Sequence, residues 1–267
     1  TLSLHDALPI SEFEVDLASS GTLGTAPAFG PLLRACALAE TIIASTRVDY
    51  TPITNSQESV SLYWYDAGLL HKLLGARGSV KIDLTSGNKP ALMFSLSGLY
   101  STPSAATPGT TSFSAFVTPL VVTDANSGDI YVGGTVASTG APAIASGTLY
   151  PSLGLDFDLG NTVQYVPLLG GESVDITQRT ATGSAKFDLT AAQEISFYAD
   201  VLAATLRAVS MLHGTVSGNK VIVHQPSVQF TEPSKEEING RRLVGFKTRA
   251  VPTPGGSGND ELRLVFF

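Results

Sequence analysis

The sequence predicts a mainly β protein with one short and one longer α-helix. Charged residues make up only 15% of the 267 residues, compared with about 25% in an average soluble domain. Short apolar runs are separated by 26 Gly and 15 Pro, together with many Ser and Thr. Within these runs apolar and polar residues alternate, which is the pattern of strands that bury one face. With 43% hydrophobic residues the chain can fill a sizeable core, so we expect it to fold.

Residues 1–30 precede the first regular element. Thr1–Ile10 begin without Met and lack the charged start, apolar run and cleavage site of a secretion signal. We treat them as an extraneous start and assign no function to His5 or Asp6. Residues 11–30 are rich in small residues, with three glycines around Pro27, and predict an extended arm outside the core.

The N-terminal half, residues 31–132, opens with the short helix. Pro31 suits a first helical position, and the apolar residues after it predict a helix to about Glu40. Residues 86–88 (Ser-Gly-Asn) predict the turn of a hairpin, and residues 101–115 predict a loop. Alternating or apolar runs predict strands at 48–50, 60–64, 80–84, 93–99 and 116–122.

A linker at 133–150, rich in Gly, Ala and Ser, leads to the C-terminal half, residues 151–267. The longer helix is expected to begin at Thr190, which forms a capping box with Gln193. One apolar stripe on this helix should lie on a sheet, and it comprises Ile195, Tyr198, Leu202, Leu206 and Val209. Strands are expected at 155–159, 221–224, 228–230, 243–246 and 262–266.

A repeated segment indicates a possible duplication of the two halves of the chain. The segment Gly78–Thr85 (GSVKIDLT) recurs as Gly183–Thr190 (GSAKFDLT), with six of eight positions identical. A looser order of helix, strands and closing hairpin recurs in residues 31–100 and 190–250. Because short β motifs also repeat by chance, the sequence leaves open whether the two halves are duplicated.

Charge and cysteine content exclude several classes of function. A net charge of −7, without a basic block, argues against a sequence-independent grip on nucleic acid. Cys36 is the sole cysteine, so the chain has no internal disulfide and no thiolate metal cage, and we expect Cys36 in the core. No run of 18 apolar residues occurs, so no membrane-spanning helix is predicted.

The sequence offers no constellation of catalytic residues. His5, His71, His213 and His224 are scattered without metal-ligand spacing, and nucleophile-elbow and phosphate-loop motifs are missing. Asp156 and Asp158 resemble a glycosidase pair in type, but their spacing is that of the solvent face of one strand. We therefore predict no catalytic, cofactor-binding or metal-ligating residue, no cofactor and no enzymatic activity.

Three adjacent aromatic residues, Tyr63, Trp64 and Tyr65, stand on a predicted strand. Alternation predicts that one of them enters the core and the other two take part in a contact between subunits. The alternative is an exposed aromatic patch on a monomeric binding module. Stacking on nucleic acid is disfavoured because Arg and Lys do not accompany the aromatics.

Four stretches, in the same order along the chain, resemble the major tail tube proteins of long-tailed, siphovirus-type bacteriophages. They are 24–40 (GTAPAFGPLLRACALAE), 61–100 (containing GLLHKLLGARGSVKIDL and FSLSGLY), 155–184 (LDFDLGNTVQYVPLLGGESVDITQRTATGS) and 258–266 (GNDELRLVF). The chain departs from the resemblance at 235–242 (KEEINGRR), where an acidic turn containing Gly is more usual.

The resemblance implies a β-sandwich or half-barrel subunit whose halves, 31–132 and 151–267, are tube-like. Copies of the chain would form hexameric or pseudo-hexameric rings that stack into the tail tube, the conduit for DNA ejection. It also implies tape-measure, tail terminator and tail-tip partners, a place in the virion tail, and assembly in the host cytoplasm. DNA would pass through the lumen without specific binding. The alternative function is a monomeric β-sandwich that binds or decorates the virion.

Overall fold

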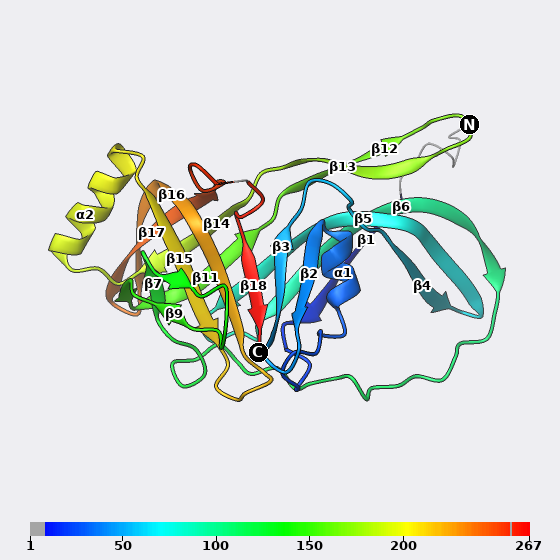
Figure 1. Ribbon diagram of the computed structural model, residues 1–267, viewed down its shortest axis with the longest axis horizontal. Coiled ribbons are helices and arrows are strands. Elements are labelled where there is room, and N and C mark those ends of the chain that lie inside the picture. Colours follow the sequence, from blue (N-terminus) through cyan, green and yellow to red (C-terminus); the bar gives the residue numbers. More distant parts are fainter. Residues whose placement is uncertain (1–8, 257) are drawn as a thin grey trace.

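The computed structural model describes residues 9–256 and 258–267, and these form a mainly β structure as predicted (Figure 1). The described residues contain two helices, α1 (Gly30–Ala35) and α2 (Ala191–Leu202), and one antiparallel sheet of 14 strands. That sheet comprises β1 (Ile10–Asp16), β2 (Leu38–Ile43), β3 (Arg47–Pro52), β4 (Val60–Asp66), β5 (Leu69–Thr85), β6 (Ala91–Ala105), β7 (Ile130–Val132), β10 (Thr148–Tyr150), β11 (Ser152–Asp158), β14 (Thr182–Phe187), β15 (Leu206–His213), β16 (Val221–Ile238), β17 (Arg241–Ala250) and β18 (Arg263–Phe266). Two further pairs are β8 (Thr135–Val136) with β9 (Ile144–Ala145), and β12 (Asn161–Val166) with β13 (Ser173–Arg179).

The long strand β16 belongs to both layers of the fold. Its first residues, 221–224, lie between β15 and β18, whereas residues 228–238 pair with β17. Pro226 stands at the change of partners, where a residue without an N–H interrupts the ladder at little cost. One layer therefore runs β2-β3-β18-β16-β15-β7-β10 and the other β1-β6-β5-β11-β14-β17-β16. This arrangement is a sandwich whose layers share a strand.

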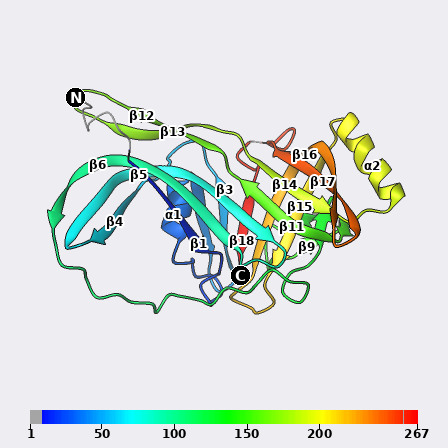
Figure 2. The same cartoon turned by 180° about the vertical axis from the view of Figure 1, so that it is seen from behind.

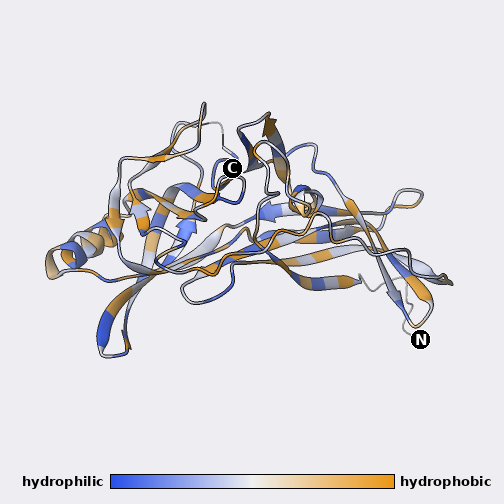
Figure 3. Cartoon of the chain, turned by 90° about the horizontal axis from the view of Figure 1, so that it is seen from below, coloured by the Kyte–Doolittle hydropathy of each residue, from blue (hydrophilic) through white to orange (hydrophobic). Residues whose placement is uncertain are grey.

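The predicted alternation positions the core. Val80, Ile82 and Leu84 of β5 are buried, whereas Lys81 between them is exposed. The same alternation of apolar and polar residues is visible along neighbouring strands (Figure 3). One apolar cluster joins these residues to Leu264 and Phe266 of β18 in the other layer. The predicted hairpin is confirmed, and it is longer than expected, because residues 101–105 continue β6 instead of forming a loop.

Both helices end earlier than predicted. Helix α1 stops at Ala35 because Ala37 adopts a left-handed backbone (φ 59°), and the chain continues as β2 where a helix to Glu40 was expected. Helix α2 begins with the predicted capping box on Thr190 but ends at Leu202. Leu206 and Val209, expected on its apolar stripe, lie in β15.

Of the stripe predicted to bury α2, only Tyr198 lies on the sheet, half-buried and with its ring 6.5 Å from that of Phe246. Ile195 and Leu202 are 72% and 89% exposed, and the helix instead buries Phe197. The Phe197 ring lies 5.4 Å or less, centre to centre, from the rings of Phe187, Phe230 and Phe246. With the Tyr150 ring of β10, 5.2 Å away, Phe197 contacts aromatic residues from four strands, and these contacts outweigh the helix's own apolar periodicity.

Two other local predictions fail, one because a segment finds no strand partner and the other because a segment does. Residues 116–122, predicted as a strand, belong to an irregular segment that runs from β6 to β7 along one side of the molecule (Figure 2). In this segment Val122 is buried and exchanges backbone hydrogen bonds with Gly87 and Asn88. The 11–30 arm also differs from expectation, because β1 pairs with β6 and Leu17 and Phe29 enter the core. The prediction for Thr1–Ile10 falls mostly on residues outside the described chain, although Ile10 pairs with Ser97.

Candidate assembly surfaces

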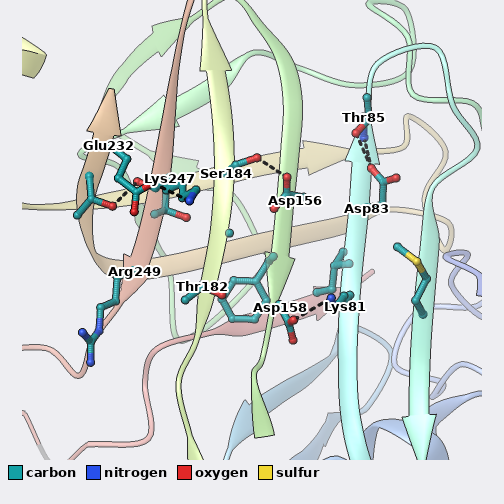
Figure 4. A pocket seen from close by; sticks show the side chains of 16 residues that line it. Lys81, Asp83, Thr85, Asp156, Asp158, Thr182, Ser184, Glu232, Lys247 and Arg249 are labelled. Atoms are coloured by element: carbon teal, nitrogen blue, oxygen red, sulfur yellow. Dashed lines mark hydrogen bonds and ion pairs between the residues drawn. The ribbon is translucent and has the colours of Figure 1, made fainter. Parts of the chain in front are cut away.

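The outer face of the layer that contains β5, β11, β14 and β17 is polar. A shallow groove of about 810 Å³ runs over it (Figure 4). The Lys81 ammonium lies 3.2 Å from the Asp158 carboxylate on the next strand, and Ser184 donates a hydrogen bond to Asp156. Asp156 and Asp158 thus lie on the solvent face of their strand, as predicted, and each has a polar neighbour. Both carboxylates lie on one face of one strand, whereas the two carboxylates of a glycosidase flank the bond that is cleaved.

Charges of both signs lie across this face, and at the β1 end Lys89 pairs with Glu14 and Asp16. Backbone register continues the polar rows to β1, where Glu14 stands opposite Met93 and Asp16 opposite Ala91. At the other side, Lys247 of β17 pairs with Glu232 of β16 at 2.6 Å. A wall of this kind has no concentrated positive charge with which to hold a nucleic-acid backbone.

Each histidine that the structure describes has a side-chain partner of its own. His213 and His224 each place Nδ1 2.7 Å from a serine hydroxyl, of Ser127 and Ser210 respectively. His71 stacks on Trp64, and His5 lies outside the described residues. Cys36 is buried as predicted, and burial raises the pKa of its thiol. Across residues 9–256 and 258–267, no three His, Cys, Asp or Glu side chains gather as a metal would require.

Burial of His224 makes stability depend on pH. Burial, and the Arg263 charge nearby, lower its pKa from the ordinary 6.5 to about 4. Between these values the unfolded chain binds a proton that the folded chain does not, so stability is lost as the pH falls below about 6.5. Asparagine at this position does not titrate and still offers a hydrogen-bonding side chain.

From pH 7 to pH 5 the wild type should therefore lose about 2 kcal/mol more unfolding free energy than His224→Asn. Urea unfolding at the two pH values measures the difference. Equal losses in the two proteins would contradict this origin of the pH dependence.

A buried charge cluster, which sequence reasoning missed, holds the 133–147 loop against β3 and β18. Arg47 and Arg263 donate to the same Asp49 oxygen, at 3.2 and 2.8 Å. Arg47 also donates to the carbonyls of Ser138 and Gly140, and Arg263 to that of Val136. The signal in the sequence is Arg-Val-Asp within a strand, which local pattern does not distinguish from a solvent-facing pair.

A β-tongue projects from the sheet, and we define it as β4 with the paired outer ends of β5 and β6, residues 69–74 and 99–105. Tyr63, Trp64 and Tyr65 of β4 are all exposed, so the prediction that one of them enters the core is wrong. Trp64 instead stacks on His71, with ring centres 5.3 Å apart. Val60 and Leu62, at the start of β4, pack against the core, whereas the strand from Tyr63 onward projects beyond the second layer of the sandwich (Figure 1).

A hairpin arm, β12–β13, projects in the same general direction and is firmly held at its base. The Asn161 side chain donates to the carbonyls of Cys36 and Gly78. Arg77 forms an ion pair with Asp175 at 2.8 Å, and Arg179 forms one with the buried Glu261 at 3.1 Å. These contacts fix the arm to β5, to the end of α1 and to the segment that precedes β18.

A family model described as phage tail tube protein matches residues 11–263, nearly the whole chain. The chain belongs to this family. No curated protein matches it. The predicted resemblance to tail tube proteins is confirmed, and this tail tube protein has the structural role in the virion tail that the family name describes. No helix in the part of the chain that the structure describes is long and apolar enough to cross a membrane.

The segment in which this tail tube protein departs from the resemblance, Lys235–Arg242, forms the turn between β16 and β17. Lys235 and Arg242 both pair with Glu194 of α2, and these contacts lower the pKa of that carboxyl. Arg241 likewise pairs with Asp188 just before the helix. The basic residues of this turn thus hold α2 beside the sheet.

Proposed function

We propose that this tail tube protein polymerises into stacked rings that form the wall of a conduit for DNA ejection, and that it has no enzymatic activity. The observation that supports this most is the open layer from β1 to β16. Within the described chain, β1 pairs with β6 alone, and residues 230–238 of β16 pair with β17 alone. Both ends of the layer therefore offer unpaired backbone groups.

Open edges of this length favour self-association. An unpaired strand edge is a template for another chain, and a closed ring of subunits removes every edge. Because the two edges of one copy differ, contact between them is head-to-tail, which closes a ring when the rotation per copy divides a full turn. We propose a hexameric or pseudo-hexameric ring as the repeating unit.

The polar face of the same layer would line the lumen. It carries Asp83, Asp156 and Asp158 among its charges, and the chain as a whole is acidic at −7. Phosphates that pass such a wall meet repulsion or neutral pairs, so DNA would slide without specific binding. Tape-measure, terminator and tip proteins would be the other partners, with assembly in the host cytoplasm and a final place in the virion tail.

Electron microscopy of the purified chain over a range of concentrations tests this proposal. We expect rings and stacked tubes above a threshold concentration, and a matching rise in mass by light scattering. A chain that stays monomeric at every concentration, and also in the presence of the other tail proteins, would contradict the proposal. That result would favour the alternative of a decoration module.

A further inference from the structure

Helix α2 exposes a face that carries no charge. Ile195 and Leu202 stand on it at 72% and 89% exposure, two turns apart. The other exposed residues of this face are Ala192, Ser196 and Ala199, and none of its described members is charged. The charged residues of the helix, Glu194 and Asp200, are engaged at its sides by Lys235, Arg242 and Arg207. The solvent-exposed face of a surface helix is normally polar. The uncharged outer face of α2 therefore indicates a surface that another molecule covers.

The β-tongue exposes apolar side chains on both of its faces. Tyr63, Trp64 and Tyr65 are 57%, 42% and 45% exposed, and alternation along β4 places Trp64 opposite the two tyrosines. Leu69 and Tyr100 add exposed apolar surface from β5 and β6. A strand with apolar residues on both faces is the pattern of one that is covered on both sides.

The two surfaces lie at opposite ends of the molecule along its longest axis (Figure 1). Helix α2 packs on β16, the strand at one open edge of the layer, while the tongue extends from β5 and β6, beside the edge strand β1 at the other. One chain cannot bring its own tongue to its own helix across that distance. In a head-to-tail arrangement, the end of one copy that carries the tongue would lie beside the end of the next copy that carries α2.

We propose that the tongue of each copy docks on the uncharged outer face of α2 in the neighbouring copy of the ring. This contact rests on the proposed function, because it assumes a ring. It adds a side-chain contact beside the edge-to-edge backbone pairing. The exposed aromatics of the tongue and the Ile195 and Leu202 side chains leave water together when the ring closes.

Charge substitutions on the two surfaces test the contact. Leu202→Lys and Tyr65→Lys each place a charge on an exposed residue, so circular dichroism and the melting temperature should stay close to those of the wild type. In the assembled state the charge would be desolvated, and the threshold concentration for tube formation should rise at least about tenfold. Val216→Lys is the matched control, because Val216 is 61% exposed and lies outside both surfaces. It should assemble like the wild type.

Cross-linking tests the pairing itself. Cys36 is buried, so single cysteines introduced elsewhere react without interference. Tubes made from a mixture of Tyr65→Cys and Leu202→Cys chains should form disulfide-linked dimers, and a mixture of Tyr65→Cys and Val216→Cys chains should not. Absence of the first cross-link, or tubes from both lysine variants at the wild-type threshold, would overturn this contact and leave the proposed function standing. A wild type that never forms tubes would overturn the proposed function and this contact with it.

Discussion

Replacing Asp49 with alanine should lower the free energy of unfolding by about 3–5 kcal/mol, because removal of one partner leaves buried charges uncompensated. The Asp49 carboxylate accepts hydrogen bonds from Arg47 and Arg263, and the Arg47 side chain is 1% exposed. Without the carboxylate, two guanidinium groups share a buried space with carbonyl oxygens as their remaining partners. Those carbonyls belong to the 136–140 segment, so the loop should loosen as well.

Urea unfolding of the wild type, Asp49→Ala and Asp49→Asn measures this effect. Asparagine preserves the shape and removes the charge, so most of the loss should remain. Lys247→Ala is the control, since its ion pair with Glu232 is 66% exposed on both side chains and should contribute less than about 1 kcal/mol. A loss for Asp49→Ala as small as that of the control would show that the cluster does not stabilise the fold.

Replacing Phe197 with alanine should also cost about 3–5 kcal/mol, through lost burial and the cavity left behind. Phe197 is the buried residue of α2, and its ring contacts those of Tyr150, Phe187, Phe230 and Phe246. Because these rings come from four strands, the cavity cannot close by the movement of one of them. Loss of this anchor should also displace the outer face of α2 on which we propose that the tongue docks.

Denaturant unfolding and near-ultraviolet circular dichroism follow the two parts of this prediction. Phe197→Leu should recover much of the stability because leucine refills part of the volume. Ile195→Ala, on the exposed side of the same helix, should change the free energy of unfolding by less than about 0.5 kcal/mol. Equal losses for Ile195→Ala and Phe197→Ala would show that α2 does not pack as described.

Sequence patterns correctly predicted features that depend only on residues close together in the chain. Alternation at 80–84 correctly predicted the buried face of β5, because a strand's two faces follow from a period of two whatever its partner is. Ser-Gly-Asn at 86–88 correctly predicted the turn after it. The capping box at Thr190 predicted where α2 begins for a similar reason, since the bonds involved span three residues. The absence of enzymatic activity, inferred from the lack of catalytic spacing in the sequence, remains a prediction that activity assays can test.

Residue patterns alone were enough to predict the strand-rich class, the buried face of β5, the hairpin that follows it, the start of α2 and the resemblance to tail tube proteins. They could not predict that Phe197 and not Ile195 is buried, that β16 serves two layers, or that Asp49 meets Arg263. Each of these depends on strands far apart in the chain, and Arg263 lies 214 residues from Asp49. The physical reason is that an apolar or charged residue gains free energy from whichever partner reaches it, and the folded topology selects that partner.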